Sequence, residues 1–326
     1  MVGTLTRLAT RGSPLALWQA ERVAAKLTGA TPGLSVELVV VDTAGDRNLD
    51  RSIGEIGGQG VFVKEIQAAV LDGRADMAVH SAKDLPSATP PGLVLSAVPE
   101  RGDPRDVLVG STLKGLAPGA NVATGSVRRR AQLAWLRPDL TFADLRGNIA
   151  TRLGKLPAGG ALVMAAVALD RLGLRPAVVE KLDLADMVPQ VGQAAIAVEC
   201  RAADGYTNEL LACINDVDEY LCVIAERAFL ATFGGGCDLP VGAHATLDGQ
   251  VITMEGIVGS PDGKVILRER RSGERAEPVA LGDALGRFLL DAGGSDLLDA
   301  GRSDLLVAGG SDPAGRPGLD PGGQAP

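Results

Sequence analysis

The order of apolar and polar residues predicts strands that alternate with helices in the first part of the chain. The expected strands cover residues 5–11, 34–43 and 76–86, and the expected helices cover 13–29 and 60–73. The first helix, "SPLALWQAERVAAKLTG", has Ser13 as its N-cap, Pro14 at its first helical position and Gly29 at its end. This alternation is typical of a mostly parallel sheet with helices on its faces.

A second alternating series begins near residue 100 and predicts a second α/β domain. The expected strands cover 121–126 and 141–147, the expected helices cover 127–137 and 148–156, and strand and helix are both expected within 161–174.

From Asn208 the pattern changes and predicts a third unit of the α+β type. A helical stretch over 208–233 precedes alternating strands over 244–273, where two Asp-Gly pairs mark turns, and an amphipathic helix is expected over 280–293. A near-repeat of eight residues, "AGGSDLLD", "AGRSDLLV" and "AGGSDPAG", then leads into a tail rich in proline and glycine. We expect this tail to be disordered.

Composition narrows the classes of function. The chain has 326 residues and a formal net charge of −8, which argues against a general nucleic-acid binder. The most continuous apolar run, residues 161–169, is too short to cross a membrane, and the first residues lack the apolar core of a signal peptide. We therefore expect a cytoplasmic protein with free thiols. Its four cysteines form no CxxC pair and its two histidines lie far apart, so no metal site is expected.

The segment "ATGSVRRRAQL" predicts an anion site at the start of a helix. Gly125 and Ser126 precede a first helical turn that contains Arg128, Arg129 and Arg130. Backbone N–H groups, a hydroxyl and guanidinium groups can together bind carboxylates, although the same residues could form a solvated basic face. Because cations oppose the dipole at a helix N-terminus, we favour ligand binding.

The segment "HSAKDLP" ends a predicted strand, where open α/β sheets bind ligands. Lys83 and Asp84 could form an ordinary surface turn, or Asp84 could protonate a leaving group or stabilise a developing cation. His80 is expected to be a core residue and not a catalyst.

The segment "TFGGGCDLPVGA" places Cys237 between three glycines and an Asp-Leu-Pro turn. A loop of this kind can present a side chain, but a free cysteine is often a small buried residue. We expect Cys200, Cys213 and Cys222, which lie in apolar strand or helix contexts, to be structural.

Eight blocks along the chain resemble the porphobilinogen deaminase (hydroxymethylbilane synthase) family. They are "ATRGSPLALWQA", "GGQGVFVKEI", "HSAKDLP", "ERGDPRD", "GSVRRRAQL", "LRGNIATRL", "AVECR" and "GGGCDLPVGAHA", within residues 5–290. The resemblance implies an α/β fold with two domains like those of periplasmic binding proteins and a third α+β domain that carries the cofactor cysteine. We expect domain 1 at 1–98 with 196–216, domain 2 at 99–195, domain 3 at 217–308 and the disordered tail at 309–326.

The resemblance also implies the reaction. The family is a transferase that deaminates porphobilinogen and joins the units head to tail through C–C bonds, releasing ammonia and a linear tetrapyrrole. Cys237 would carry a dipyrromethane cofactor through a thioether, and Asp84 would be catalytic. The implied cofactor-binding residues are Ser13, Lys83, Asp84, Ser126, Arg128 and Arg129, and the implied substrate-binding residues are Arg11, Arg146, Arg152 and Arg171. A monomer that binds the small-molecule substrate and neither nucleic acid nor membrane is expected.

Two positions depart from the family pattern, which often has lysine at Gln59 and glycine at Ala194. Alanine is unfavourable at the second position if the backbone there needs a positive φ. A small-anion binder without catalysis is the rival hypothesis, and it predicts no special cysteine. A thiol hydrolase is less favoured, because no orienting carboxylate is evident near Cys237 and His244.

Overall fold

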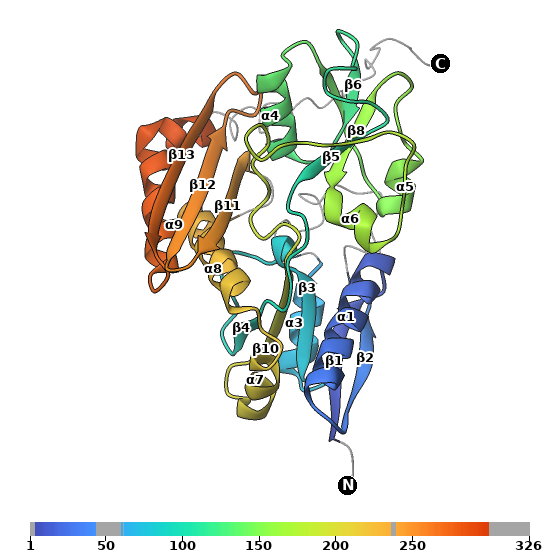
Figure 1. Cartoon of the computed structure of the whole chain (residues 1–326), viewed down its shortest axis with the longest axis vertical. Helices are drawn as coiled ribbons and strands as arrows, with labels where there is room; N and C mark the ends of the chain where they lie inside the picture. The colour runs from blue at the N-terminus through green and yellow to red at the C-terminus, as the bar shows by residue number, and fades with distance from the viewer. Residues whose placement is uncertain (1–3, 44–59, 61, 236–238, 300–326) are drawn as a thin grey trace, which may run out of the picture.

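A computed structural model describes residues 4–43, 60, 62–235 and 239–299, so Gln59 and Cys237 lie outside the described part of the chain. The described residues form two five-stranded sheets and one three-stranded sheet, each with its own helices (Figure 1). The first unit lies at the bottom of the view, the second at the upper right and the third at the upper left.

The first unit has the strand order β2-β1-β3-β10-β4. Its strands are β1 (Thr4–Arg11), β2 (Leu34–Val41), β3 (Met77–Ser81), β4 (Leu93–Ala97) and β10 (Ile196–Arg201), and its helices are α1 (Pro14–Ala30), α3 (Lys64–Leu71) and α7 (Gly205–Ala212). Side chains alternate along β1, so Leu8 packs with Val23 and Leu27 of α1, whereas Ala9 packs with Ile66 of α3. The sheet is therefore covered on both faces.

The second unit repeats this plan with the order β7-β6-β8-β5-β9. Its strands are β5 (Asp106–Val109), β6 (Asn121–Ala123), β7 (Thr141–Ala143), β8 (Ala161–Ala165) and β9 (Val179–Lys181), and its helices are α4 (Val127–Leu136), α5 (Ile149–Leu153) and α6 (Ala166–Arg171). Leu133 of α4 packs on one face with Leu108 and Val163, and Leu169 of α6 packs on the other face with Met164.

The third unit is an antiparallel sheet packed on helices. It contains α8 (Val217–Thr232), β11 (Val241–Asp248), β12 (Val251–Gly259), β13 (Ile266–Glu274) and α9 (Pro278–Leu289), which continues into a π-helical turn at Leu290–Gly294. Asp248 pairs with Val251 at the hairpin between β11 and β12, as its Asp-Gly sequence predicts. Phe229 of α8 is fully buried in this core together with Leu285 of α9.

Two segments of chain cross between the first and second units, residues 98–105 after β4 and 182–195 before β10. They contact each other, because the N–H of Gly102 donates to the carbonyl of Ala194 at 3.1 Å and the N–H of Ile196 donates to the carbonyl of Glu100 at 3.1 Å. We call them the crossing segments. In each sheet one strand directly follows a crossing segment, β10 in the first unit and β5 in the second. This strand is antiparallel to both of its neighbours.

The expected fold class is confirmed, with two α/β units and an α+β unit. The expectation of a mostly parallel sheet is confirmed for strand direction, because four of the five strands in each α/β sheet run the same way. The fifth strand, β10 or β5, enters from the other unit and runs antiparallel. The helical stretch over 208–233 is two helices, since Asp216 caps a new helix with its side chain. The proposed domain boundaries stay a prediction.

Candidate functional site

Lys83 and Asp84 lie at the end of β3, in a single 3-10 turn over Ala82–Asp84. Both are partly exposed. The Nζ of Lys83 donates to Oε1 of Gln193 at 3.5 Å. Burial and the nearby charge of Arg129 lower the pKa of Lys83 to about 8, although Asp84 opposes this change. Arg152 also lowers this pKa and Asp106 also raises it, so Lys83 lies between two arginines and two carboxylates.

The N-terminus of α4 brings two arginines onto one buried carboxylate. Ser126 is the N-cap, and its Oγ accepts a hydrogen bond from the N–H of Arg129 at 3.4 Å. The Nη2 of Arg128 donates to Oδ2 of Asp106 at 2.7 Å, while Arg129 donates to Oδ1 through Nε at 3.0 Å and Nη2 at 2.8 Å. We call Asp106, Arg128 and Arg129 the Asp106 centre.

Asp106 is 0% exposed at the start of β5, and the two arginines are 1% and 7% exposed. Burial alone would raise the pKa of Asp106, but Arg128 and Arg129 outweigh burial and hold this pKa well below its usual range. Arg128 also donates through Nη1 to the carbonyl of Val188 at 2.6 Å. Its Nε is buried and has no hydrogen-bond partner among the described residues.

Arg146 and Arg152 add positive charge from the segment around α5. Asn148 caps this short helix, and Nε of Arg152 donates to the carbonyl of Gly147 at 2.7 Å. Burial, Arg129 and Arg146 lower the pKa of Arg152, whereas Asp84 raises it. Lys83, Arg129, Arg146 and Arg152 therefore share one electrostatic environment with Asp84, and we call these four residues the cation cluster.

The other predicted binding residues lie at the ends of β1 and α6. Arg11 ends β1, and its guanidinium lies 4.0 Å from the ring centre of Phe62. Ser13 is the N-cap of α1 and accepts from the N–H of Ala16 at 3.4 Å, as its sequence predicts. None of the described contacts of Ser13 or Arg11 is with the cation cluster.

Arg171 joins the second unit to the first. Its Nη2 donates to the carbonyl of Ala194 at 2.7 Å, and its guanidinium lies 5.1 Å from the ring centre of Trp18 on α1. Burial lowers the pKa of Arg171 to about 10, with Glu100 opposing. Ala194 has a φ of 70°, so the position does adopt the left-handed conformation that favours glycine.

The described cysteines and His80 occupy different environments. Cys200 and Cys222 are buried, and burial raises the pKa of Cys222 to about 12. Cys213 is exposed, so the expectation of an apolar setting is wrong for this residue, which follows α7 at its C-cap. His80 is buried, with Nε2 at 3.2 Å from Oε2 of Glu199, as a core residue would be.

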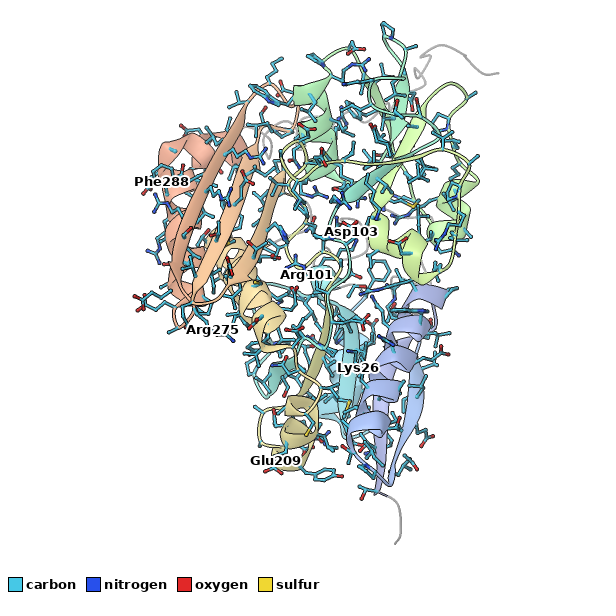
Figure 2. All side chains as sticks on the ribbon, viewed as in Figure 1. Lys26, Arg101, Asp103, Glu209, Arg275 and Phe288 are labelled. Atoms are coloured by element: carbon cyan, nitrogen blue, oxygen red, sulfur yellow. The ribbon has the colours of Figure 1, made fainter. Side chains whose placement is uncertain are left out.

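A second buried carboxylate lies where the three units meet. Oε1 of Glu226 accepts from Nη1 of Arg101 at 2.8 Å and from the N–H of Ala245 at 2.8 Å. Oε2 accepts from Nη2 of Arg101 at 3.2 Å and from the N–H of Gly192 at 2.7 Å, while Nδ1 of His244 lies 3.4 Å from Oε1. We call Glu226, Arg101 and His244 the Glu226 centre. Figure 2 labels Arg101 at this meeting point.

The sequence reasoning missed three residues that organise these centres, namely Asp106, Gln193 and Glu226. Asp106 ends the block "ERGDPRD", and Gln193 directly precedes the departure from the family pattern at Ala194. An acidic residue at the start of an apolar strand was the available signal for Asp106. Within α8, nothing in the sequence separates Glu226 from an exposed glutamate.

In the described part of the chain, no three His, Cys, Asp or Glu side chains are grouped so that they could hold a metal ion. No described helix is long and apolar enough to span a membrane.

Comparisons with known proteins match nearly the whole chain. The sequence profile described as "Porphobilinogen deaminase, dipyromethane cofactor binding domain" matches residues 6–209, and the profile described as "Porphobilinogen deaminase, C-terminal domain" matches residues 220–291. A protein of Syntrophobacter fumaroxidans named porphobilinogen deaminase is 46% identical over 298 residues, which cover 90% of this chain and 96% of the relative. A protein of Roseiflexus castenholzii with the same name is 49% identical over 291 residues, which cover 88% of this chain and 96% of the relative.

Among solved structures, a probable amino-acid ABC transporter extracellular-binding protein of Bacillus subtilis is 9% identical, with a TM-score of 0.41 over 65% of this chain and 90% of that chain.

Proposed function

The chain belongs to the porphobilinogen deaminase family, and we propose that it joins porphobilinogen units head to tail into the linear tetrapyrrole hydroxymethylbilane, with loss of one ammonia per unit. The observation that carries the proposal is the meeting of Lys83 and Asp84 from the first unit with Arg129 and Arg152 from the second. One carboxylate beside several cations suits a substrate that has an acetate, a propionate and an aminomethyl arm. Each added ring brings two further carboxylates, which explains why an acidic protein concentrates cations here.

The described residues fit a dipyrromethane group by the chemistry of their donors. The cation cluster and the Asp106 centre together hold five cations beside two carboxylates, Asp84 and Asp106. Nε of Arg128 is a buried donor without a partner among the described residues. Added carboxylates would supply the missing negative charge and acceptors. The residues proposed to hold the group are Ser13, Lys83, Asp84, Ser126, Arg128 and Arg129, with Cys237 as the covalent anchor. When bound, the group supplies the free α-carbon to which the first porphobilinogen unit is joined.

Arg128 and Arg129 differ in what they can offer. The two terminal nitrogens of Arg128 each donate once, to Val188 and Asp106, and its Nε is the nitrogen without a partner among the described residues. The charge of Arg129 lowers the pKa of both Lys83 and Arg152, so Arg129 belongs to the cation cluster as well as to the Asp106 centre. We propose that Arg129 contributes most to carboxylate binding, and that Arg128 contributes mainly by fixing the N-terminus of α4.

The proposed chemistry needs a fixed negative charge beside the substrate. The aminomethyl arm reacts in its protonated ammonium form. As its C–N bond breaks, the electron pair leaves with the nitrogen as ammonia and positive charge develops on the pyrrole. The carboxylate of Asp84 accepts the pyrrole N–H and stabilises this charge. The new C–C bond then forms, and the joined carbon loses its proton to solvent. Arg11, Arg146, Arg152 and Arg171 are proposed to hold the substrate carboxylates, and so to orient the reacting carbons.

Substitution of Asp84 tests the proposal. Asp84→Asn keeps the size and one acceptor but removes the charge, so the rate of chain extension should fall by about 100-fold or more. Asp84→Glu keeps the charge at a shifted position and should retain intermediate activity. The measurement is single-turnover formation of enzyme-bound oligopyrroles from porphobilinogen, resolved by intact mass. Asp72→Asn, on a surface carboxylate paired with Arg74, is the control and should extend at the rate of the unsubstituted protein.

Equal rates for Asp84→Asn and the unsubstituted protein would reject the catalytic role of this carboxylate. Binding of porphobilinogen without release of ammonia, in the unsubstituted protein itself, would instead support the rival function of a small-anion binder.

We also propose that the protein acts as a monomer in the cytoplasm and binds no nucleic acid. The net charge of −8 supports the last point, since phosphate backbones bind basic surfaces. Sedimentation of the purified chain with and without duplex DNA measures both its mass and its binding. A dimer, or co-sedimentation with DNA, would contradict this part of the proposal.

A further inference from the structure

Gln193 occupies an unusual place on the second crossing segment. It is fully buried and lies between two residues with positive φ, Gly192 at 69° and Ala194 at 70°. Its N–H donates to the carbonyl of Gln190 at 2.9 Å, and its own carbonyl accepts from Nε of Arg101 at 3.1 Å. The backbone around Gln193 is therefore held from both sides, and its side chain has a defined direction.

The contacts of the amide nitrogen fix which way the side chain faces. Nε2 donates to the carbonyl of Pro104 at 2.7 Å and to Oδ1 of Asp106 at 2.9 Å. Both partners are acceptors only, so the nitrogen must lie on this side and the oxygen on the other. Oε1 accordingly accepts from two cations, Nζ of Lys83 at 3.5 Å and Nη2 of Arg129 at 3.5 Å.

These two cations come from different units. Lys83 follows β3 of the first unit, and Arg129 belongs to α4 of the second. Two like charges repel each other, and a shared neutral oxygen can hold both without cancelling either charge. A carboxylate in the same place would neutralise part of the positive charge that is needed for a ligand, and a hydrocarbon would leave the cations without this acceptor.

We infer that Gln193 is a positioning residue that holds Lys83 and Arg129 together across the two units, and so sets the charge and width of the site for carboxylates. This inference rests on the proposed function for its biological meaning. Gln193 itself touches no reacting atom in this account, because its side chain is fully used by Pro104, Asp106 and the two cations.

The ammonium of Lys83 reports directly on this arrangement. The charged groups that face it are Asp84 on its own turn, Arg129 on α4, Asp106 on β5 and Arg152 on α5. Burial and Arg129 bring the pKa of Lys83 down to about 8, so its charge is lost within an accessible pH range. Gln193→Glu adds an adjacent negative charge and should raise this pKa, whereas Gln193→Met removes an acceptor and should lower it.

The experiment follows the Cε signal of Lys83 by NMR during a pH titration of the full chain, purified before any exposure to porphobilinogen. Lys83→Arg identifies the signal. We expect the midpoint to move up by about one pH unit or more in Gln193→Glu and to move down in Gln193→Met. A purely structural role of Gln193 would not produce shifts of opposite sign.

Gln132→Glu is the matched control. Gln132 is also buried, on α4, and bonds the same crossing segment through Val188, donating from Nε2 at 3.0 Å and accepting at Oε1 at 2.8 Å. None of its described contacts is with Lys83. An equal shift in Gln132→Glu, or an unmoved midpoint in both Gln193 variants, would overturn the inference. If the Gln193→Glu and Gln193→Met variants do not fold, Gln193→Asn is used, which moves the acceptor away from the cations by one methylene. The titration midpoint of Lys83 should then fall. An unmoved midpoint in Gln193→Asn would also overturn the inference.

The rate of adduct formation on Cys237 provides a second readout. As pH rises through the pKa of Lys83, the ammonium loses its charge and binds carboxylates less well, so the rate should fall on the alkaline side. This fall should move to higher pH in Gln193→Glu, in step with the NMR midpoint. If the unsubstituted chain forms no adduct at any pH while the midpoints still shift, the proposed function fails and the positioning role stands. If adducts form but the midpoints do not shift, the proposed function stands and the positioning role of Gln193 fails.

Discussion

The Asp106 and Glu226 centres are both buried carboxylates bound by arginine, but they differ in the number of arginines. Each has a carboxylate that is 0% exposed, beside a crossing segment and bound by arginine, and in each the cations outweigh burial and hold the carboxylate pKa low. Glu226 has one arginine close to it, and both of its oxygens are occupied by Arg101 and by backbone N–H groups. Asp106 has two arginines, so its centre keeps an excess of positive charge.

We propose that this excess separates a structural centre from one that shapes the proposed carboxylate site. The charge of Arg129 lowers the pKa of both Lys83 and Arg152. The described contacts of Glu226, in contrast, all lie at the junction of the three units. Burial and ion pairing are thus poor guides to function by themselves. In this comparison, the better guide to a binding role is the number of cations in excess of the carboxylate that they bind.

Asp106→Asn should have the largest effect on the comparison. An amide cannot neutralise two buried guanidinium groups, and its nitrogen would face one of them, so the free energy of unfolding should fall by about 3–5 kcal/mol. In the protein that still folds, α4 loses its anchor and adduct formation should slow by roughly tenfold or more. Denaturant unfolding and time-resolved intact mass measure the two effects.

Asp103→Asn is the control for this substitution. Asp103 lies on the crossing segment that leads into Asp106, with Arg105 at 2.7 Å and Lys181 at 2.8 Å, but it is partly exposed. Its loss should change stability by about 1 kcal/mol or less and leave the rate unchanged. Normal adduct formation in folded Asp106→Asn would remove the distinction between the two centres.

Glu226→Gln should lower stability with less effect on assembly. The pKa of Glu226 lies at about 2, below its ordinary 4.5, because Arg101 and His244 outweigh burial. This difference corresponds to roughly 3 kcal/mol of stability. A lowered folded-state pKa stabilises above the unfolded value, so this contribution is present above pH 4.5 and is lost as pH falls toward about 2.

Acid unfolding of Glu226→Gln should therefore be less steep between these limits than that of the unsubstituted protein. Glu255→Gln, on a partly exposed residue paired with Arg268, is the matched control in the third unit and should keep the original acid profile. A tenfold loss of adduct formation in folded Glu226→Gln would show that the Glu226 centre also shapes the site.

Ala194→Gly should have the smallest effect. Glycine removes the strain of an alanine in the left-handed conformation, which costs about 1–2 kcal/mol. It also removes a buried methyl group, worth about 0.8 kcal/mol, and increases the conformational entropy of the unfolded chain, and both of these changes destabilise the fold. The net change in unfolding free energy should stay within about 1 kcal/mol. Ala195→Gly, next to it, is buried without positive φ and should destabilise by about 1–2 kcal/mol. Equal destabilisation by both variants would show that Ala194 carries no strain.

Local signals in the sequence predicted much of the fold. Ser13 and Pro14 specify the start of α1 through the capping group and the ring themselves, and the structure begins the helix there. The antiparallel direction of β10 and β5 was not predicted, because it depends on how the chain crosses between the two units. The interruption at Asp216 was also missed, since apolar spacing continues across it.

For the candidate site, the sequence predicted residue types and places but not the contacts among those residues. Three arginines in one helical turn indicated an anion site, yet which of them faces inward depends on Asp106, which lies 22 residues before Arg128. Arg130 is exposed, whereas Arg128 and Arg129 are buried. Gln193 could not be recognised for the same reason, because its partners come from both crossing segments and from two units.

The most direct test of the central claim is the intact mass of the purified chain, before and after addition of porphobilinogen. The account predicts a mass above that of the sequence by one dipyrromethane group, lost in Cys237→Ser, and further regular increments for each ring that is added with loss of ammonia. A mass equal to that of the sequence, with no increments when porphobilinogen is supplied, would contradict the account.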